Sequence, residues 1–343
     1  MNSRRFDLDQ STRHRSATTA PDRTALAADV ARHDDVPSAP RVSIVLPTHR
    51  RPRHLARAIA TVQAQTITDW ELIVVDDNDP RHPERLHTEQ ALARHVGDPR
   101  IRFLRHDDNR GGSAARNTGI RAARGAWIAF LDDDDEWHAS KLERQLELAA
   151  DSTADVALVY CRIHERHVGT GRESVYRSEP DKCNVRDLFR RNHIGGTSCV
   201  MCRADALHAV GLFDEALASR QDIDLYVRLA GRYSFAFVDA ALVTMNLHGD
   251  GRISTNLRSK VKGHTQFFEK HRERIEPDPV ALRARLNEMG RFLLASHDLL
   301  AARRVLIRAW SLEVRDGVAL KRLLLTFPTV RSVRYQARRV LGI

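Results

Sequence analysis

Residues 126–135 read Ala126-Trp127-Ile128-Ala129-Phe130-Leu131-Asp132-Asp133-Asp134-Asp135, an uncharged apolar run that ends in four consecutive carboxylates. A short apolar run of this kind is typical of a buried strand in a parallel sheet. Adjacent carboxylates repel one another unless a cation neutralises them, and Mg²⁺ or Mn²⁺ prefers such hard oxygen ligands together with substrate phosphates. We interpret the segment as a buried strand that leads into a cation-binding loop. The alternative is a solvated acidic loop, which the flanking Phe130 and Trp137 disfavour.

The chain before this segment alternates between predicted strands and predicted helices. Apolar, β-branched runs predict strands, and periodic apolar positions predict helices. The strands are expected at 42–47, 70–75 and 101–104, and the helices at 53–65, 84–95 and 111–124. This alternation predicts an α/β fold with a mostly parallel sheet flanked by helices, in which ligands bind beyond the carboxyl ends of the strands.

Polar residues follow the first two predicted strands at that edge. After Pro47, Thr48 is expected either to cap the next helix or to line the site, and Arg51 is placed to reach a phosphate or a ribose. Asp76 and Asp77 end the second strand and offer acceptors to a base or to ribose hydroxyls, the alternative being an ordinary Asp/Asn turn.

Three further positions are candidates for chemistry. Gly111-Gly112 begins a helix whose backbone N–H groups favour an anion, with Arg116 directed toward the same edge. Asp222 falls in the first turn of a predicted helix and is a candidate general base for a hydroxyl. The alternative reading is a capping Asp222 followed by a surface Asp224. His248 is a candidate for contact with a metal or a diphosphate, although a lone histidine is more often structural.

Charge and composition divide the chain of 343 residues into three parts. Residues 1–38 have few large apolar side chains and predict a flexible tail. Residues 39–254 carry the α/β pattern, and 255–343 predict a basic helical region. From residue 252 onward, 20 Lys and Arg stand against 8 Asp and Glu, a balance of +12, so the rest of the chain is close to neutral at −2 and the net charge is +10. With neither an apolar leader nor a spanning segment in the sequence, we expect a cytoplasmic protein.

Two other function classes compete with a metal-dependent enzyme. A basic protein without enzymatic activity, binding nucleic acid or a membrane surface through its C-terminal helices, would explain the positive charge but not the four aspartates. A nucleotidyltransferase would need a Gly-rich loop with Arg and Lys directly after the first strand, which the sequence lacks there. Cys199 and Cys202 form a CxxC without the partners of a zinc site, and we expect them to be buried thiols in a strand.

Six ordered segments cover roughly residues 42–254: Val42–Arg51, Glu71–Asp77, Gly111–Gly125, Phe130–Trp137, Val210–Glu215 and Gln221–Arg228. In this order they resemble glycosyltransferase family 2, the inverting group with a GT-A fold. The resemblance implies transfer of one sugar from a nucleotide-diphosphate donor, most commonly a UDP-sugar, to a glycan or lipid-linked acceptor. Gln221 departs from the family's usual acidic residue before the base. No Gln-x-x-Arg-Trp motif is present, so single transfer is favoured over polymerisation.

The resemblance also implies roles for individual residues. Asp222 would be the base, and Asp134 and Asp132, with His248, would hold Mg²⁺ or Mn²⁺. The nucleotide pocket would be lined by Pro47, Thr48, Arg51, Asp76, Asp77, Arg116, Asp132 and Asp133. A further hypothesis is that the basic C-terminal helices make peripheral contact with an anionic membrane that bears the acceptor. Nucleic acid is not expected as a partner.

Overall fold

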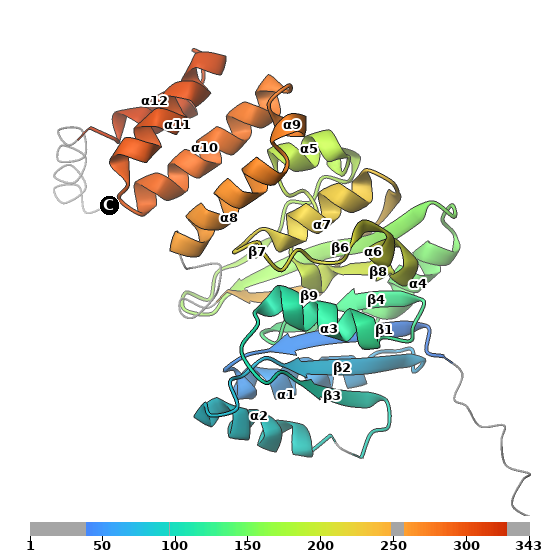
Figure 1. Cartoon of the computed structure of the whole chain (residues 1–343). Coiled ribbons are helices and arrows are strands. Elements are labelled where there is room, and N and C mark those ends of the chain that lie inside the picture. Colours follow the sequence, from blue (N-terminus) through green and yellow to red (C-terminus); the bar gives the residue numbers. More distant parts are fainter. Residues whose placement is uncertain (1–38, 96, 248–256, 328–343) are drawn as a thin grey trace, which may run out of the picture. The chain divides into compact units, whose positions relative to one another are not determined.

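The computed structural model describes residues 39–95, 97–247 and 257–327. The predicted tail at 1–38, the predicted boundary at 254–255 and His248 lie outside these ranges. The centre of the structure is one sheet with the strand order β3-β2-β1-β4-β8-β6-β9-β5, with β7 paired to β6 (Figure 1). The predicted α/β class is therefore confirmed, and the sheet has a parallel half and a mixed half.

The parallel half contains the four strands that were predicted. It consists of β1 (Val42–Thr48), β2 (Trp70–Asp76), β3 (Ile101–Arg105) and β4 (Trp127–Phe130), all paired in parallel. Three helices connect them: α1 (Pro52–Gln63), α2 (Pro83–Ala93) and α3 (Gly112–Ala122). Every residue of β2 is buried, as expected for a strand covered on both faces.

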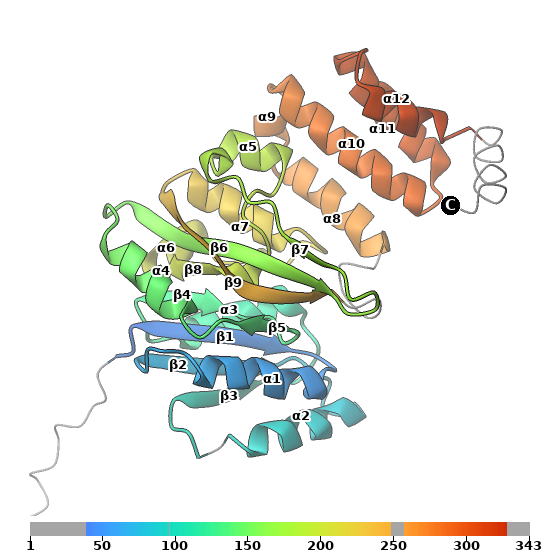
Figure 2. The same ribbon diagram turned by 180° about the vertical axis from the view of Figure 1, so that it is seen from behind.

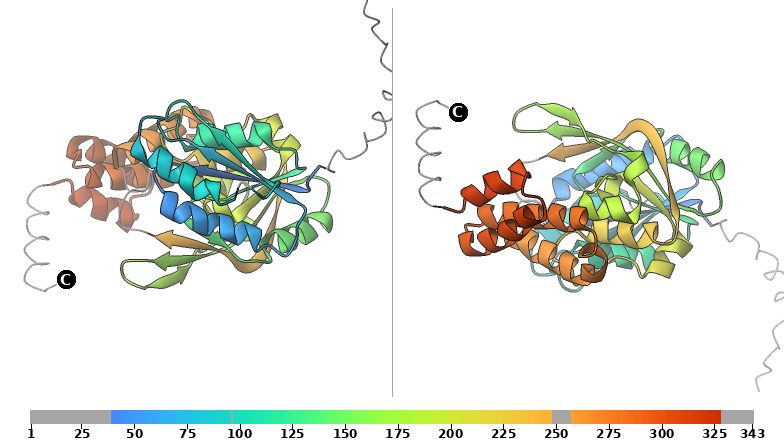
Figure 3. Two further views of the ribbon diagram at one scale, coloured as in Figure 1. Left: turned by 90° about the horizontal axis from the view of Figure 1, so that it is seen from below. Right: turned by 90° about the horizontal axis from the view of Figure 1, so that it is seen from above.

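The two faces of this half are covered by different helices. Ile44 and Leu46 of β1 belong to the main core with Leu55 of α1, whereas α3 packs on the opposite face. Figures 2 and 3 show α1 and α3 on the two sides of the sheet. The approach of α3 is close, since a Cβ added to Gly119 would lie 2.4 Å from a methyl group of Val45. Glycine is therefore required there by space.

The mixed half of the sheet follows the acidic segment. It contains β5 (Asp135–Trp137), β6 (Val156–His167), β7 (Glu173–Val175), β8 (Val200–Arg203) and β9 (Ser234–Leu247). β6 pairs with β9 in parallel and with β7 and β8 antiparallel. The β6–β7 hairpin closes around Gly169 and Gly171. Its helices are α4 (Lys141–Ala150), α5 (Val185–Arg190), α6 (Ala204–Val210) and α7 (Gln221–Ala230), with short 3₁₀ turns at Pro180–Lys182 and Thr197–Cys199.

The chain then becomes helical. The helices are α8 (Leu257–Lys270), α9 (Arg272–Ile275), α10 (Pro279–Ala295), α11 (Leu299–Leu312) and α12 (Gly317–Leu324), coloured orange to red in Figure 1. α10 packs against α8, α11 and α5, and its buried Leu286 belongs to the same apolar core as the sheet. None of the described helices has both the length and the apolar character that crossing a bilayer requires.

The prediction for Cys199 and Cys202 is right for burial and wrong in part for the strand. Both are unpaired and fully buried, and burial raises the pKa of both thiols. Of these two, Cys202 lies in β8 but Cys199 does not, because residues 197–199 form a 3₁₀ turn before the strand.

Candidate functional site: the acidic loop and the start of α7

The acidic loop is fixed between two strands of the sheet. Asp133, Asp134 and Asp135 are at most 6% exposed, so this is a buried acidic segment and not a solvated one. Ser198 holds its two ends, because its hydroxyl accepts from the Asp132 N–H at 3.1 Å and donates to Asp135 Oδ2 at 2.6 Å. Asn246 of β9 donates to the Asp134 carbonyl at 2.9 Å. The carboxylates are thus positioned by groups from distant parts of the chain.

Thr48 and Arg51 reach these carboxylates from the end of β1. The Thr48 hydroxyl donates to Asp133 Oδ2 at 2.8 Å, and Arg51 Nη1 lies 2.8 Å from Asp134 Oδ2. The prediction that Thr48 caps α1 is wrong. The N-cap position is Arg51, without a side-chain cap, because the Thr48 hydroxyl is used across the sheet edge instead.

Burial and charge in this segment affect the pKa of Asp133. Burial, together with the charges of Asp134 and Asp132, raises the pKa of Asp133 to about 7, although Arg51 and the Thr48 hydroxyl act in the opposite direction. A buried carboxylate beside like charges favours its neutral form. An additional cation would therefore relieve a real electrostatic cost at this position.

Arg116 connects the acidic segment to the start of α7. Its guanidinium forms an ion pair with Asp132, and Thr197 Oγ1 donates to the same carboxylate oxygen at 3.2 Å. The charge of Arg116 also acts on Asp222, whose Oδ2 accepts from Asn192 Nδ2 at 3.2 Å. The structure thus brings the predicted base, Arg116 and the acidic segment into one neighbourhood.

The environment of Asp222 suits a general base. Its side chain is half-buried in the first turn of α7, and it does not cap the helix, whose N-cap is Arg220. Burial raises the pKa of Asp222 above the ordinary value and outweighs a backbone hydrogen bond and the charges of Arg220 and Arg116, which lower it. A raised carboxyl pKa improves proton acceptance near neutral pH.

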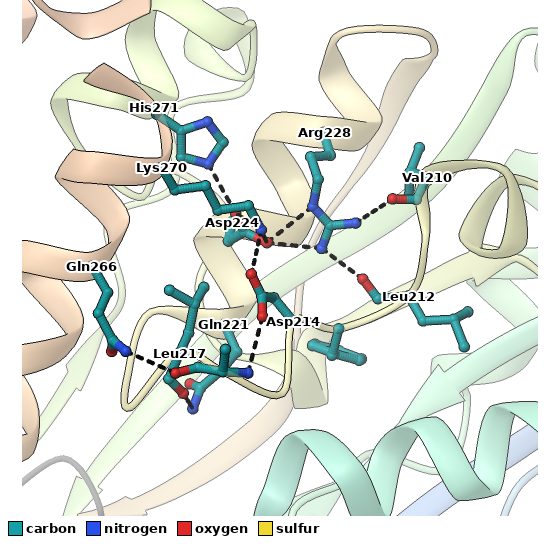
Figure 4. Close-up of polar contacts among 12 residues, drawn as sticks. Val210, Leu212, Asp214, Leu217, Gln221, Asp224, Arg228, Gln266, Lys270 and His271 are labelled. Carbon is teal, nitrogen blue, oxygen red and sulfur yellow. Dashed lines mark hydrogen bonds and ion pairs between the residues drawn. The ribbon is translucent and has the colours of Figure 1, made fainter. Parts of the chain in front are cut away.

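Asp224 is not the surface residue that the alternative reading supposed. It is fully buried and accepts from His271 Nε2 at 2.8 Å, while Arg228 and Lys270 contact the same carboxylate at 2.8 Å and 2.9 Å (Figure 4). Burial alone would raise the pKa of Asp224, but these three partners outweigh it and lower the pKa to about 2. The cluster anchors α7 to α8, and so fixes the helix that carries Asp222.

Asp77 is engaged in a separate network. Its carboxylate accepts from the backbone N–H groups of Arg110 and Gly111, each at 2.8 Å, and contacts His106 Nδ1 at 2.7 Å. The predicted anion-binding helix start thus holds a carboxylate of the chain itself, with Gly111 at a φ of +87°. Neighbouring Asp76 is buried and accepts from Asn78. Reading of the base by Asp76 or Asp77 stays a prediction.

Two of the sequence segments meet through Asn117 of α3. Asn117 Nδ2 donates to the Phe213 carbonyl at 2.9 Å, and the Phe213 N–H donates to Asn117 Oδ1 at 3.0 Å. The Phe213 ring then packs edge-on against Phe130 at the end of β4, with centroids 5.3 Å apart. Residues 210–215 therefore pack against the end of β4, directly before the acidic segment.

The donor set fits a hard divalent cation. Asp134 and Asp132 offer carboxylate oxygens at a site where burial, together with their own charges, raises the pKa of Asp133. Within the described ranges, however, no three His, Cys, Asp or Glu side chains are grouped closely enough to hold a metal by themselves. Mg²⁺ and Mn²⁺ commonly complete their coordination with substrate phosphates, so two protein carboxylates are sufficient.

Sequence comparisons find glycosyltransferases. Residues 43–211 match the model of Glycosyl transferase family 2. "Putative colanic acid biosynthesis glycosyl transferase WcaA" of Escherichia coli K12 is 29% identical over 245 residues, which are 69% of this chain and 83% of that protein.

Two solved structures share the fold. Staphylococcus aureus TarS 1–349 in complex with UDP-GlcNAc has a TM-score of 0.56 and 15% identity, over 87% of this chain and 92% of that chain. The mannosyltransferase PcManGT of Pyrobaculum calidifontis, in complex with GDP-Man and Mn²⁺, has a TM-score of 0.53 and 17% identity, over 86% and 87%. The sheet of this chain, with helices on both faces, is therefore of the GT-A type. This chain belongs to glycosyltransferase family 2.

Proposed function

We propose that the protein transfers a single sugar, with inversion, from a nucleotide-diphosphate donor to a hydroxyl of a glycan or lipid-linked acceptor. UDP is the proposed nucleotide. The carrying observation is that Asp222 lies within the electrostatic influence of Arg116, which pairs with Asp132 of the acidic segment. A base for the attacking hydroxyl and a segment that could bind the leaving diphosphate therefore lie close enough to act in one displacement.

In this proposal Asp222 accepts the proton of the acceptor hydroxyl as that oxygen attacks the anomeric carbon. Asn192 orients the carboxylate by donating to Oδ2. Arg51 and Arg116 are the positive side chains next to the acidic segment, and they are assigned to the diphosphate. Mg²⁺ or Mn²⁺, held by Asp134 and Asp132, would neutralise charge on the leaving group. A single displacement inverts the configuration.

Calorimetric titration with UDP, GDP and dTDP, with and without Mn²⁺, tests the donor site. The chain and its Asp134→Ala variant are compared. We expect metal-dependent binding of one nucleotide, about tenfold or more weaker in the variant because a charged metal ligand is lost. If none of the three nucleotides binds, with or without Mn²⁺, the proposal is wrong.

Family membership argues against a binding protein without transferase activity. The nucleotidyltransferase alternative is tested by the product, since a glycosyltransferase releases a nucleoside diphosphate and a nucleotidyltransferase releases pyrophosphate.

We further propose that the C-terminal helices contact the cytoplasmic face of an anionic membrane. α11 and α12 combine basic residues with exposed apolar side chains, among them Leu300 at 69% exposure, Val318 at 53% and Leu324 at 45%. Exposed apolar groups among cations are typical of helices that bind at a membrane surface.

Vesicle sedimentation tests this contact. The chain should bind vesicles of phosphatidylcholine with phosphatidylglycerol more strongly than vesicles of phosphatidylcholine alone, and a Leu300→Ser/Leu324→Ser variant should bind less. A matched variant at exposed Leu86 of α2 serves as the control. Equal binding by all three proteins would contradict a role for these helices.

A further inference from the structure

A cavity of about 410 Å³ lies beside the start of α7, between the end of α5 and helices α10 and α12. One carboxylate, Glu288, lines it. Six arginines do so as well, namely Arg190, Arg191, Arg220, Arg285, Arg291 and Arg322. Like charges that are gathered in this way repel one another unless a ligand or a compensating group is present.

Glu288 compensates only part of this charge. Its carboxylate lies 2.9 Å from Arg285 Nη1, 3.4 Å from Arg220 Nη1 and 3.5 Å from Arg291 Nη2, so three guanidinium groups share one anion. Arg190 pairs with Asp187 of its own helix and with Asp278, and Arg191 pairs with Glu179, none of which lines the cavity. The residues that line the cavity therefore carry a positive excess.

The cavity wall also contains buried arginine groups that are not fully paired. Arg285 is 3% exposed, and in the described part of the chain its Nε has no hydrogen-bond partner; the same holds for the buried Nε atoms of Arg190 and Arg220. Burial and the charge of Arg220 lower the pKa of Arg285 to about 9. Burial and the same arginine lower the pKa of His264 to about 3. An anion in the cavity would counter the contribution that the charge of Arg220 makes to both pKa values.

The cavity is connected directly to the proposed base. Asn192 lines it and donates to Asp222 Oδ2, and Arg220 stands two residues before Asp222 with a φ of +69°. A left-handed backbone is costly for arginine, and its guanidinium is held by His264 and Glu288. A group bound here would lie on the acceptor side of Asp222.

We propose that this cavity, the arginine pocket, binds a phosphate group of the acceptor and thereby orients the acceptor hydroxyl toward Asp222. This rests on the proposed function, which it deepens by assigning a phosphorylated acceptor. Phosphate is favoured over carboxylate because its additional oxygens accept from several guanidinium groups at once.

The test uses a charge-removing variant of the more exposed pocket arginines, Arg191→Gln/Arg291→Gln. Their side chains are 48% and 53% exposed and each pairs with one glutamate, so the fold should tolerate the change. The matched control is Arg272→Gln/Arg308→Gln, whose side chains are 46% and 49% exposed and also pair with glutamates, but lie outside the pocket. Inorganic phosphate is titrated into each full-length protein in the presence of UDP and Mn²⁺.

We expect phosphate to bind the chain and the control equally, and to bind the pocket variant about tenfold more weakly. Equal phosphate affinity in all three proteins, or no phosphate binding to any of them, would overturn the proposal. Stronger binding of glucuronate than of phosphate would also overturn it. A water-soluble sugar 1-phosphate and a detergent-dispersed polyprenyl phosphate are then compared as competitors, which separates a free from a lipid-linked phosphate. UDP binding is measured separately, so failure of the donor site is distinguished from failure of the pocket.

Discussion

At the scale of single residues, Asp222 carries the sharpest prediction. Asp222→Asn keeps the shape of the side chain but removes the base, so turnover should fall by about 10²- to 10⁴-fold. UDP binding should persist, because Asp222 is assigned to the acceptor side. Steady-state kinetics and calorimetry on the same preparations measure both quantities.

The matched control is Asp205→Asn in the first turn of α6, where the carboxylate is 69% exposed. The pH profile gives a second check. Because burial raises the pKa of Asp222, the acid side of the activity profile should lie above the pH at which an ordinary aspartate is protonated. Full activity of Asp222→Asn would contradict the assignment.

Several contacts at the site follow from local sequence and others do not. Thr48 and Asp133 were both expected at the carboxyl ends of parallel strands, and they are joined by a hydrogen bond. Ser198 and Asn246 were not predicted, since each reaches the acidic segment only through pairing of strands far apart in the chain. The engagement of Asp77 by the loop before α3 likewise depends on a loop conformation that residue spacing does not define.

At the scale of elements, the ionic cluster of Asp224 should determine how firmly α7 is held. Asp224→Asn leaves Arg228, Lys270 and His271 without their shared carboxylate, and should lower the free energy of unfolding by about 3 kcal/mol. Urea denaturation near neutral pH measures this. Asp239→Asn, at a carboxylate 69% exposed, should change it by less than about 0.5 kcal/mol.

The same cluster defines a pH dependence. The folded pKa of Asp224 is about 2, below the ordinary aspartate value of 3.8, so its contribution to stability is complete above pH 3.8 and is lost as the pH falls through about 2. The stability difference between the chain and Asp224→Asn should therefore shrink as the pH falls from about 5 toward about 2. A stability difference that stays constant over this pH range would mean that the cluster stabilises the fold through packing and not through the charge of Asp224.

Elements of the parallel half were predictable because each is a short apolar run bounded by turn residues. In the mixed half, β5 has only three residues and β9 alternates irregularly between buried and exposed positions. The pairing of β6 with β9 contains register shifts. Such strands are defined by long-range pairing, so local pattern does not reveal them.

At the scale of the whole molecule, the C-terminal helices share the apolar core of the sheet. Leu286 of α10 and Leu306 of α11 belong to one cluster with Ile44 and Phe130. We therefore expect a single cooperative transition in scanning calorimetry of the chain, because a continuous core unfolds as a unit. Two separate transitions would indicate that the basic helical region is an independent domain.

The ion pairs of Arg51 have a consequence for the order in which ligands assemble. Its guanidinium lies 2.8 Å from Asp134 and 3.4 Å from Asp133, so a divalent cation arriving alone would compete with it. In the proposed function, a diphosphate would give that guanidinium another partner and free the carboxylates for the metal. We therefore predict that metal and nucleotide favour each other's binding, and by thermodynamic reciprocity each would raise the affinity of the other by the same factor. Such cooperativity would need no movement of the sheet.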